Sequence, residues 1–175
     1  HRDLHSLRRR QRQMCIRDSL MFDKDFDAIT CFFTSINYVL KNEDMERLFA
    51  GVFRSLRRGG IFIADIPNPY KMERWLEGIP TIWRVDHEKM SILIIDAVIM
   101  DNVSGLVDWR RTLIVDKEGR IEFIPDYHRL RAYTANELKI YAKYAGFRRA
   151  RVYGDLRITD EEPRDAKRLF FVAVK

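Results

Sequence analysis

The chain has 175 residues, of which 46% are hydrophobic and 33% charged, and its formal net charge is +6. This indicates one soluble globular domain. Its longest apolar runs, residues 61–66 and 92–100, are too short to cross a bilayer, which takes about 20 residues. The two cysteines, Cys15 and Cys31, form no CxxC motif and no metal-ligand spacing with the four histidines. We therefore expect a reduced, cytoplasmic protein with no signal peptide, no membrane partner and no bound metal.

Residues 1–20 differ from the rest of the chain. They hold six arginines and two aspartates, so they carry four of the six net positive charges. The segment has no helical or strand period, and its stretch RQMCIRDS resembles translated sequencing-adapter strings found in metagenomic gene predictions. We interpret residues 1–20 as non-native; the alternatives are a disordered tail and a basic arm that binds RNA or acidic lipid. The small charge left on residues 21–175 argues against nucleic acid as their partner.

Two short apolar runs predict buried strands. FDAITCFF (26–33) and IFIADI (61–66) are nearly continuous in apolar residues, as strands covered on both faces are. Pro67 ends the second strand, because proline cannot donate to a ladder. The stretch TSINYVL (34–40) turns the chain out of the first strand.

A strongly amphipathic helix is predicted between those strands, over about residues 43–58. Asn42 is a good N-cap, and apolar residues from Met45 onward recur at helical spacing. Gly59 is a natural left-handed cap, and Gly59 and Gly60 together would turn the chain back into the sheet. Strand, helix and strand in this order predict a βαβ unit with two parallel strands.

Residues 81–133 change character. Strand-like stretches alternate with the turn sequences DNVSG (101–105) and DKEG (116–119), which predicts an antiparallel meander inserted into an α/β chain. The meander could cover a substrate pocket or form the sheet of a homodimer. Trp75, Trp83 and Trp109 are interpreted as large apolar anchors in a pocket roof, a core or a dimer contact.

The α/β order returns at Thr134. The run Thr-Ala-Asn-Glu that begins there is a capping box for a helix that extends to about Ala145, and Gly146 would end it. The rest is predicted as a strand, a loop and a last antiparallel strand: RARVYGD (149–155), RITDEEPRDA (157–166) and RLFFVAVK (168–175).

Three stretches in this order resemble the carboxyl-terminal part of class I S-adenosylmethionine-dependent methyltransferases. Residues 26–69 are similar to the family's fourth strand, the helix after it and the fifth strand, with Arg-Arg-Gly-Gly where the family's usual turn is Lys-Pro-Gly-Gly. Residues 128–155 are similar to the last helix and sixth strand, and residues 167–175 to the seventh, antiparallel strand. The resemblance implies an α/β fold: a partial Rossmann-like methyltransferase sheet (strands 4–7 of seven) with an inserted antiparallel meander, in a truncated domain over residues 21–175.

The family's glycine-rich cofactor loop has no counterpart in this sequence. Only eight glycines occur, and none forms a GxG pattern after a strand. The resemblance implies that strands one to three, which carry that loop and the ribose-binding acid, would lie upstream of residue 22. We therefore expect the gene to continue upstream, and this chain by itself to lack much of the cofactor site.

The resemblance implies methyl transfer from S-adenosylmethionine to a small-molecule N or O acceptor. Ligands of open α/β sheets bind beyond the carboxyl ends of the strands, which here are the ends near residues 32–38 and 65–68. The resemblance implies two groups of residues at the first end. The group beside the methionine part of the cofactor is Phe32, Phe33 and Thr34. The group that faces the substrate is Ser35, Asn37 and Tyr38.

Other candidate residues have two interpretations each. Tyr38 stands where related sugar-amine methyltransferases carry a histidine that is a candidate base; it could orient an acceptor or pack as a core aromatic. Asp65 could hydrogen-bond an acceptor amine or cap its loop through Asn68, itself a candidate substrate contact. His128 and Arg131 could bind an anionic substrate or belong to a solvated edge strand.

Two further functions stay open at this stage. A non-enzymatic nucleic-acid-binding module would use the arginine-rich residues 1–20 and exposed aromatic residues of the meander. A methyltransferase acting on RNA or protein is also compatible with the fold, because a fold does not specify a substrate.

Overall fold

The computed structural model describes residues 26–72, 78–155, 157–161 and 165–175. They form two compact units, and each is described here by itself. Unit 1 comprises the described residues up to Asn68 and from Tyr133 to Lys175, and unit 2 is Pro69–Ala132. Residues 1–20, which we interpreted as non-native, and Trp75 lie outside the described residues.

Unit 1 contains a five-stranded sheet in the order β1-β2-β9-β7-β8. Strands β1 and β2 are parallel, and β9 is antiparallel to both of its neighbours, as predicted for the last strand. The bounds are β1 Phe26–Cys31, β2 Leu56–Pro67, β7 Arg149–Gly154, β8 Arg157–Glu161 and β9 Arg168–Val174. The prediction of a loop over residues 157–166 was wrong, because β8 pairs with β7 there.

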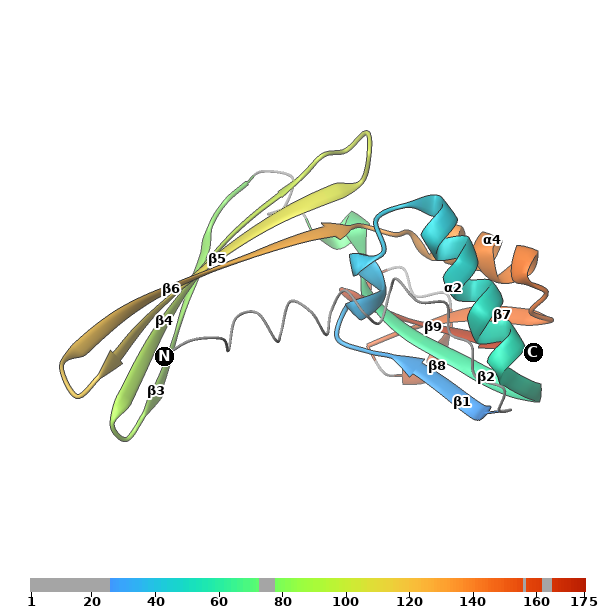
Figure 1. Cartoon of the computed structure of the whole chain (residues 1–175), viewed down its shortest axis with the longest axis horizontal. Helices are drawn as coiled ribbons and strands as arrows, with labels where there is room; N and C mark the ends of the chain where they lie inside the picture. Colours follow the sequence, from blue (N-terminus) through green and yellow to red (C-terminus); the bar gives the residue numbers. More distant parts are fainter. Residues whose placement is uncertain (1–25, 73–77, 156, 162–164) are drawn as a thin grey trace. The chain divides into compact units, whose positions relative to one another are not determined.

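Two helices cover one face of this sheet, α2 (Asn42–Ser55) and α4 (Ala135–Ala145) (Figure 1). Phe49 of α2 is fully buried at the centre of the core. Its ring centroid lies 5.6 Å from that of Phe62 and 5.9 Å from that of Phe171, both on the sheet. The apolar face predicted from helical spacing therefore packs on the sheet. Burying such an aromatic side chain stabilises the folded state by about 1.5–3 kcal/mol.

The amino-terminal end of α4 carries the predicted capping box. The Thr134 hydroxyl accepts a hydrogen bond from the Glu137 backbone N–H at 3.2 Å, and the Glu137 carboxylate accepts one from the Thr134 N–H at 2.7 Å. Gly146 follows the helix with a φ of 102°, the left-handed cap that the sequence predicted. Both ends of α4 are thus determined by local sequence.

The predicted bounds of the first helix were wrong at its carboxyl end, and Asn42, predicted as the N-cap, is the first residue of the helix, with Lys41 as the N-cap. Helix α2 ends at Ser55, and Leu56–Gly60 already belong to β2. Gly59 is left-handed (φ 78°) but inside the strand, where its N–H donates to the Lys175 carbonyl at 2.9 Å. Because Gly59 pairs with Lys175, residues 56–60 form part of strand β2 and not of the helix. A local sequence pattern cannot show a contact with a residue so far along the chain.

Strand β1 is less buried than predicted. Its Asp27, Ala28 and Thr30 are exposed, whereas the sequence predicted a strand covered on both faces. In the part of the chain that the structure describes, β1 is the last strand on its side of the sheet. Phe32 and Phe33, predicted as strand residues, lie beyond its end at Cys31.

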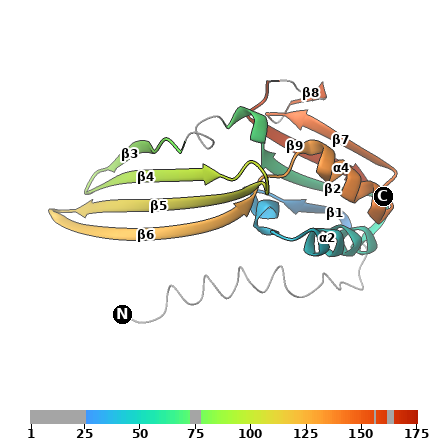
Figure 2. The ribbon, with the colours of Figure 1, turned by 90° about the horizontal axis from the view of Figure 1, so that it is seen from above.

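Unit 2 is the predicted antiparallel meander. Its four-stranded sheet has the order β3-β4-β5-β6, and the long strands β4, β5 and β6 run side by side (Figure 2). The bounds are β3 Thr81–His87, β4 Met90–Met100, β5 Leu106–Lys117 and β6 Arg120–Arg131. Short 3-10 helices occur at η1 Ser35–Tyr38 in unit 1 and η2 Pro69–Lys71 in unit 2. No helix among the described residues is both long and apolar enough to cross a membrane.

Candidate active site

A left-handed turn follows the carboxyl end of β1. Phe33 and Thr34 have φ values of 58° and 63°, a region that residues other than glycine rarely adopt. The turn leads into η1, and the Ser35 hydroxyl donates a hydrogen bond to the Phe32 carbonyl at 2.6 Å. The turn exposes two aromatic side chains: Phe33 is 91% exposed and Phe32 40%. Phe32, Phe33 and Thr34 are the predicted cofactor contacts.

A buried carboxylate lies beside this turn, near the carboxyl end of β2. Asp65 is only 4% exposed. Its Oδ1 accepts a hydrogen bond from the Thr34 backbone N–H at 3.3 Å, and its Oδ2 forms an ion pair with Arg168 at the start of β9. Both terminal nitrogens of Arg168 also donate to the Thr34 hydroxyl, at 3.0 and 3.2 Å. The carboxylate is therefore paired with a cation and holds the turn.

Two predicted substrate contacts near this edge are buried. Asn68 donates its side-chain N–H to the Ala166 carbonyl at 3.0 Å, and its backbone N–H to the Lys167 carbonyl at 2.9 Å. Asn37, in η1, is 1% exposed. Tyr38, at the end of η1, is half-buried, and Ser35 is exposed. The substrate roles of these residues stay predictions.

Cys31, the last residue of β1, carries a half-buried free thiol of low reactivity. Burial, together with the negative charge of Asp65, raises the pKa of Cys31 to about 11. A thiol with this pKa stays protonated near neutral pH, and only the thiolate is a good nucleophile. We assign Cys31 no catalytic role.

The predicted residues of the meander do not share one face of it. His128 pairs with Trp109 and Arg131 with Leu106 across β5 and β6, and side chains alternate along a strand, so His128 and Arg131 lie on opposite faces of the sheet. His128 is 8% exposed and lies 2.9 Å from the Asp126 carboxylate. The geometry argues against these two residues binding one anion together.

A charged network in unit 2 was missed by the sequence analysis. Asp96 of β4 is buried, and its two carboxylate oxygens accept hydrogen bonds from Arg111 at 2.7 and 2.8 Å. The Trp109 indole N–H donates to the same carboxylate at 2.8 Å, and Arg111 stacks on the Trp109 ring at 4.7 Å. Burial by itself would raise the pKa of Asp96, but the hydrogen bonds from Arg111 and Trp109 outweigh it, so the pKa is lowered.

A signal for this network exists in the sequence. Trp109 and Arg111 are two residues apart on one strand, and β4 brings an acidic residue opposite them. From the sequence, Trp109 was predicted only as an apolar anchor, so its hydrogen bond to Asp96 was not expected. Arg168 was missed for a different reason, since its partners Asp65 and Thr34 lie 103 and 134 positions away.

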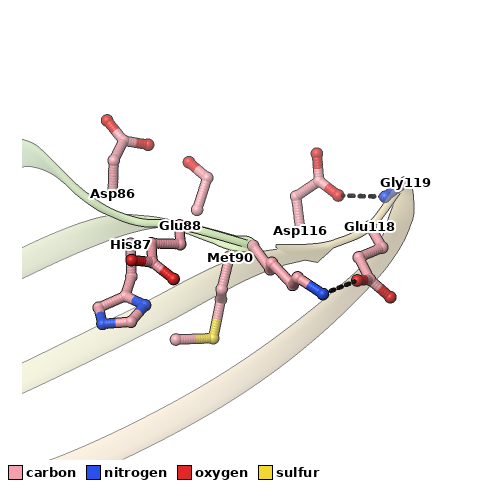
Figure 3. Close-up of a pocket in the computed structure, with 9 residues that line it drawn as sticks. Asp86, His87, Glu88, Met90, Asp116, Glu118 and Gly119 are labelled. Carbon is pink, nitrogen blue, oxygen red and sulfur yellow. Dashed lines mark hydrogen bonds and ion pairs between the residues drawn. The ribbon is translucent and has the colours of Figure 1, made fainter.

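A shallow pocket of about 390 Å³ lies at the tips of the β3–β4 and β5–β6 hairpins (Figure 3). Figure 3 shows the Asp86 and Asp116 side chains on one side of the hairpins and His87 and Met90 on the other. Its polar groups are exposed hairpin residues, among them an ion pair of Lys89 with Glu118 at 3.6 Å. We assign it no chemistry, because its polar side chains do not converge.

Comparisons with known proteins show which proteins this chain is similar to. No family model matches the chain. A Geobacillus sp. (strain WCH70) protein, provisionally named a methyltransferase, is 28% identical over 152 residues, which are 86% of this chain and 59% of the relative. The Bacillus subtilis (strain 168) protein YqeM, with the same kind of provisional name, is 29% identical over 165 residues, 93% of this chain and 64% of the relative. The chain thus spans less than two thirds of the length of these curated relatives.

Solved structures show the same fold. An S-adenosylmethionine-dependent methyltransferase from Clostridium acetobutylicum matches with a TM-score of 0.72 at 19% identity, covering 98% of this chain and 70% of that one. CalS10, an amino pentose methyltransferase from Micromonospora echinaspora, solved with S-adenosylmethionine bound, matches with a TM-score of 0.72 at 23% identity, covering 90% and 62%. The sugar N-methyltransferase KedS8 from Streptoalloteichus matches with a TM-score of 0.70 at 19% identity, covering 90% and 60%.

The chain therefore has the fold of class I S-adenosylmethionine-dependent methyltransferases, and the predicted resemblance is confirmed. The sheet β1-β2-β9-β7 with its antiparallel β9 is compatible with the partial Rossmann-like sheet that the sequence predicted.

Proposed function

We propose that this chain takes part in methyl transfer from S-adenosylmethionine to an N or O atom of a small molecule. The observation that carries the proposal is the left-handed turn after β1, which exposes Phe33 at the carboxyl edge of a methyltransferase sheet. This edge is where open α/β sheets bind ligands.

The side chains at this edge suit the methionine part of the cofactor, which carries the sulfonium. A sulfonium cation is attracted to the face of an aromatic ring, and Phe32 and Phe33 offer exposed rings. The charge of Asp65 is already paired with Arg168, so the fit rests on Phe32, Phe33 and Thr34. S-adenosylmethionine, when bound, supplies an electrophilic methyl group.

The residues of this chain would act mainly by orienting the acceptor. Displacement at a methyl carbon depends first on proximity and alignment, and a base is needed only where the acceptor must lose a proton. We assign the orienting role to the phenol of Tyr38 and give Asp65 a role in holding the turn. Ser35, with its exposed side chain, is the other candidate for contact with the acceptor.

Amino sugars are the first acceptors to test. Two of the structures with this fold are described as an amino pentose methyltransferase and a sugar N-methyltransferase. The alternative of a nucleic-acid-binding module depends on residues 1–20, which lie outside the described residues, and the relatives give it no support.

A homodimer and a cytoplasmic location are part of the same proposal. One face of the unit 2 sheet presents Ile82, Ile121 and Phe123, which are 65%, 63% and 66% exposed. Covering such apolar side chains favours association with a second copy. The cytoplasmic location is supported by the small number of cysteines, two in 175 residues, with no CxxC motif.

Because this chain spans less than two thirds of its curated relatives, the test is a turnover assay with the whole protein to which it belongs, S-adenosylmethionine and a panel of amino sugars, in which S-adenosylhomocysteine is detected by mass spectrometry. We expect product with at least one amino sugar, and its loss in Phe33→Ala. Tyr144→Ala, which truncates another strongly exposed aromatic residue (83% exposed) on α4 of the same unit, is the matched control. Absence of product from the unmodified protein, or full product from Phe33→Ala, would contradict the proposal.

A further inference from the structure

The strained turn after β1 needs something to hold it. Two consecutive residues, Phe33 and Thr34, are left-handed although neither is glycine. Left-handed backbone in residues with a Cβ persists only where surrounding contacts impose it. The exposed ring of Phe33 makes little contact of its own, since the residue is 91% exposed.

The contacts that impose this conformation come from two strands. Asp65 of β2 accepts the Thr34 backbone N–H, and Arg168 of β9 donates twice to the Thr34 hydroxyl. Arg168 and Asp65 are themselves an ion pair, with Asp65 buried and Arg168 40% exposed. We call Thr34, Asp65 and Arg168 the turn clamp. Every member contacts the other two.

The chemistry of arginine suits this task. Its planar guanidinium presents several N–H donors in a fixed fork, so one side chain can bind a carboxylate and a hydroxyl together. A lysine would offer a single point charge on a flexible stem. The buried Asp65 in turn requires a cation, because an uncompensated buried carboxylate is strongly unfavourable.

We propose that Arg168 is a positioning residue, which together with Asp65 clamps the Phe33–Thr34 turn so that the Phe33 ring stays presented at the carboxyl edge of the sheet. The role in ligand binding rests on the proposed function. The clamp itself does not, since it consists of contacts between residues of this chain.

The first test measures the turn without any ligand. Chymotrypsin cleaves after exposed phenylalanines when the local backbone can open, so cleavage after Phe33 under native conditions reports release of the turn. Thr34→Val keeps the branched shape of threonine and removes the hydroxyl that Arg168 binds. We expect cleavage after Phe33 to become about tenfold faster in Thr34→Val, the loss expected for hydrogen bonds from a charged donor.

Two matched variants make this test specific. Thr34→Ser keeps the hydroxyl and should be cleaved within about twofold of the unmodified chain. Thr30→Val makes the same isosteric change at an exposed position of β1 and should also leave the rate unchanged. Equal cleavage of Thr34→Val and the unmodified chain overturns the clamp, as does equal acceleration by Thr30→Val.

A second variant guards against a simple loss of folding. Arg168→Lys keeps a positive charge beside Asp65 but not the fork, so the protein should stay folded by circular dichroism while cleavage after Phe33 accelerates. Unchanged cleavage in Arg168→Lys overturns the role of the guanidinium.

The ligand arm separates this inference from the proposed function. Saturation-transfer NMR measures contact of S-adenosylmethionine with the protein, and we expect Thr34→Val to reduce the transfer several-fold while Thr34→Ser retains it. No transfer to the unmodified chain overturns the proposed function and the clamp's role in binding. Full transfer to Thr34→Val together with accelerated cleavage overturns only that role.

Discussion

Removing only the cation from the Asp65–Arg168 pair should reduce the stability of the folded state more than removing both charges. Asp65 is 4% exposed in the structure, and in Arg168→Gln this buried carboxylate loses its cationic partner. Breaking a buried ion pair in this way costs about 3–5 kcal/mol, and because Arg168 is 40% exposed we expect the lower end, about 3 kcal/mol. Asp65→Asn leaves a guanidinium that water can reach, so it should cost only about 1 kcal/mol.

The double variant Asp65→Asn/Arg168→Gln tests this reasoning directly. It leaves two neutral amides that can hydrogen-bond to each other. We expect the free energy of unfolding to fall by about 2 kcal/mol, whereas the losses of the two single variants add up to about 4 kcal/mol. The difference, about 2 kcal/mol, is the coupling energy of the pair. Urea unfolding followed by circular dichroism at 222 nm reports on unit 1, because α2 and α4 both lie there. Fluorescence of Trp83 and Trp109 reports on unit 2 in the same samples.

The expected shifts are large enough to measure. With a urea slope of about 2 kcal/mol per molar, the Arg168→Gln midpoint should fall by about 1.5 M. A double variant whose loss equals the sum of the single losses would refute the ion pair as the reason for the destabilisation. A fluorescence midpoint that moves while the circular dichroism midpoint does not would refute the assignment of the pair to unit 1.

Three other outcomes are expected. Phe49→Ala should destabilise unit 1 by about 3–5 kcal/mol in the same urea assay, because Phe49 is fully buried among aromatic rings; a loss below 1 kcal/mol would contradict that packing. Because the folded pKa of Asp96 lies below its unfolded value, its network stabilises unit 2 above that unfolded value, and the stability is lost as pH falls through the folded pKa. Asp96→Asn should therefore flatten the pH dependence of the fluorescence transition below about pH 4, and an unchanged profile would exclude the network as its source. Cys31, with its pKa raised to about 11, should react with iodoacetamide at pH 8 about a hundredfold more slowly than an ordinary thiol, and at an ordinary rate once urea unfolds the chain.

The sequence was a good guide wherever the determining contacts are local. The capping box at Thr134 and the left-handed cap at Gly146 depend on residues within one or two turns, and both were predicted correctly. The meander was equally predictable, because strand alternation and turn residues repeat along residues 81–133. The parallel pairing of β1 with β2 follows from the strand–helix–strand order.

The sequence was a poor guide wherever distant residues decide the structure. Helix α2 ends early because Gly59 pairs with Lys175, and β8 forms because β7 offers it an edge. The same holds for the site: local patterns marked Asp65 as a residue of interest, but its partners come from β1 and β9. The left-handed conformation of Phe33 and Thr34 had no signal in the sequence, since neither residue is one that favours it.

The most direct test of the account is whether S-adenosylmethionine contacts the turn after β1. In saturation-transfer NMR on the chain, magnetisation should pass from the protein to the S-methyl protons of the ligand, because we place the sulfonium beside the exposed rings of Phe32 and Phe33. Transfer that is lost in Phe33→Ala and kept in Tyr144→Ala is the predicted result. Transfer that persists in Phe33→Ala, or that the unmodified chain never shows, would contradict the claim that this edge of the sheet holds the cofactor.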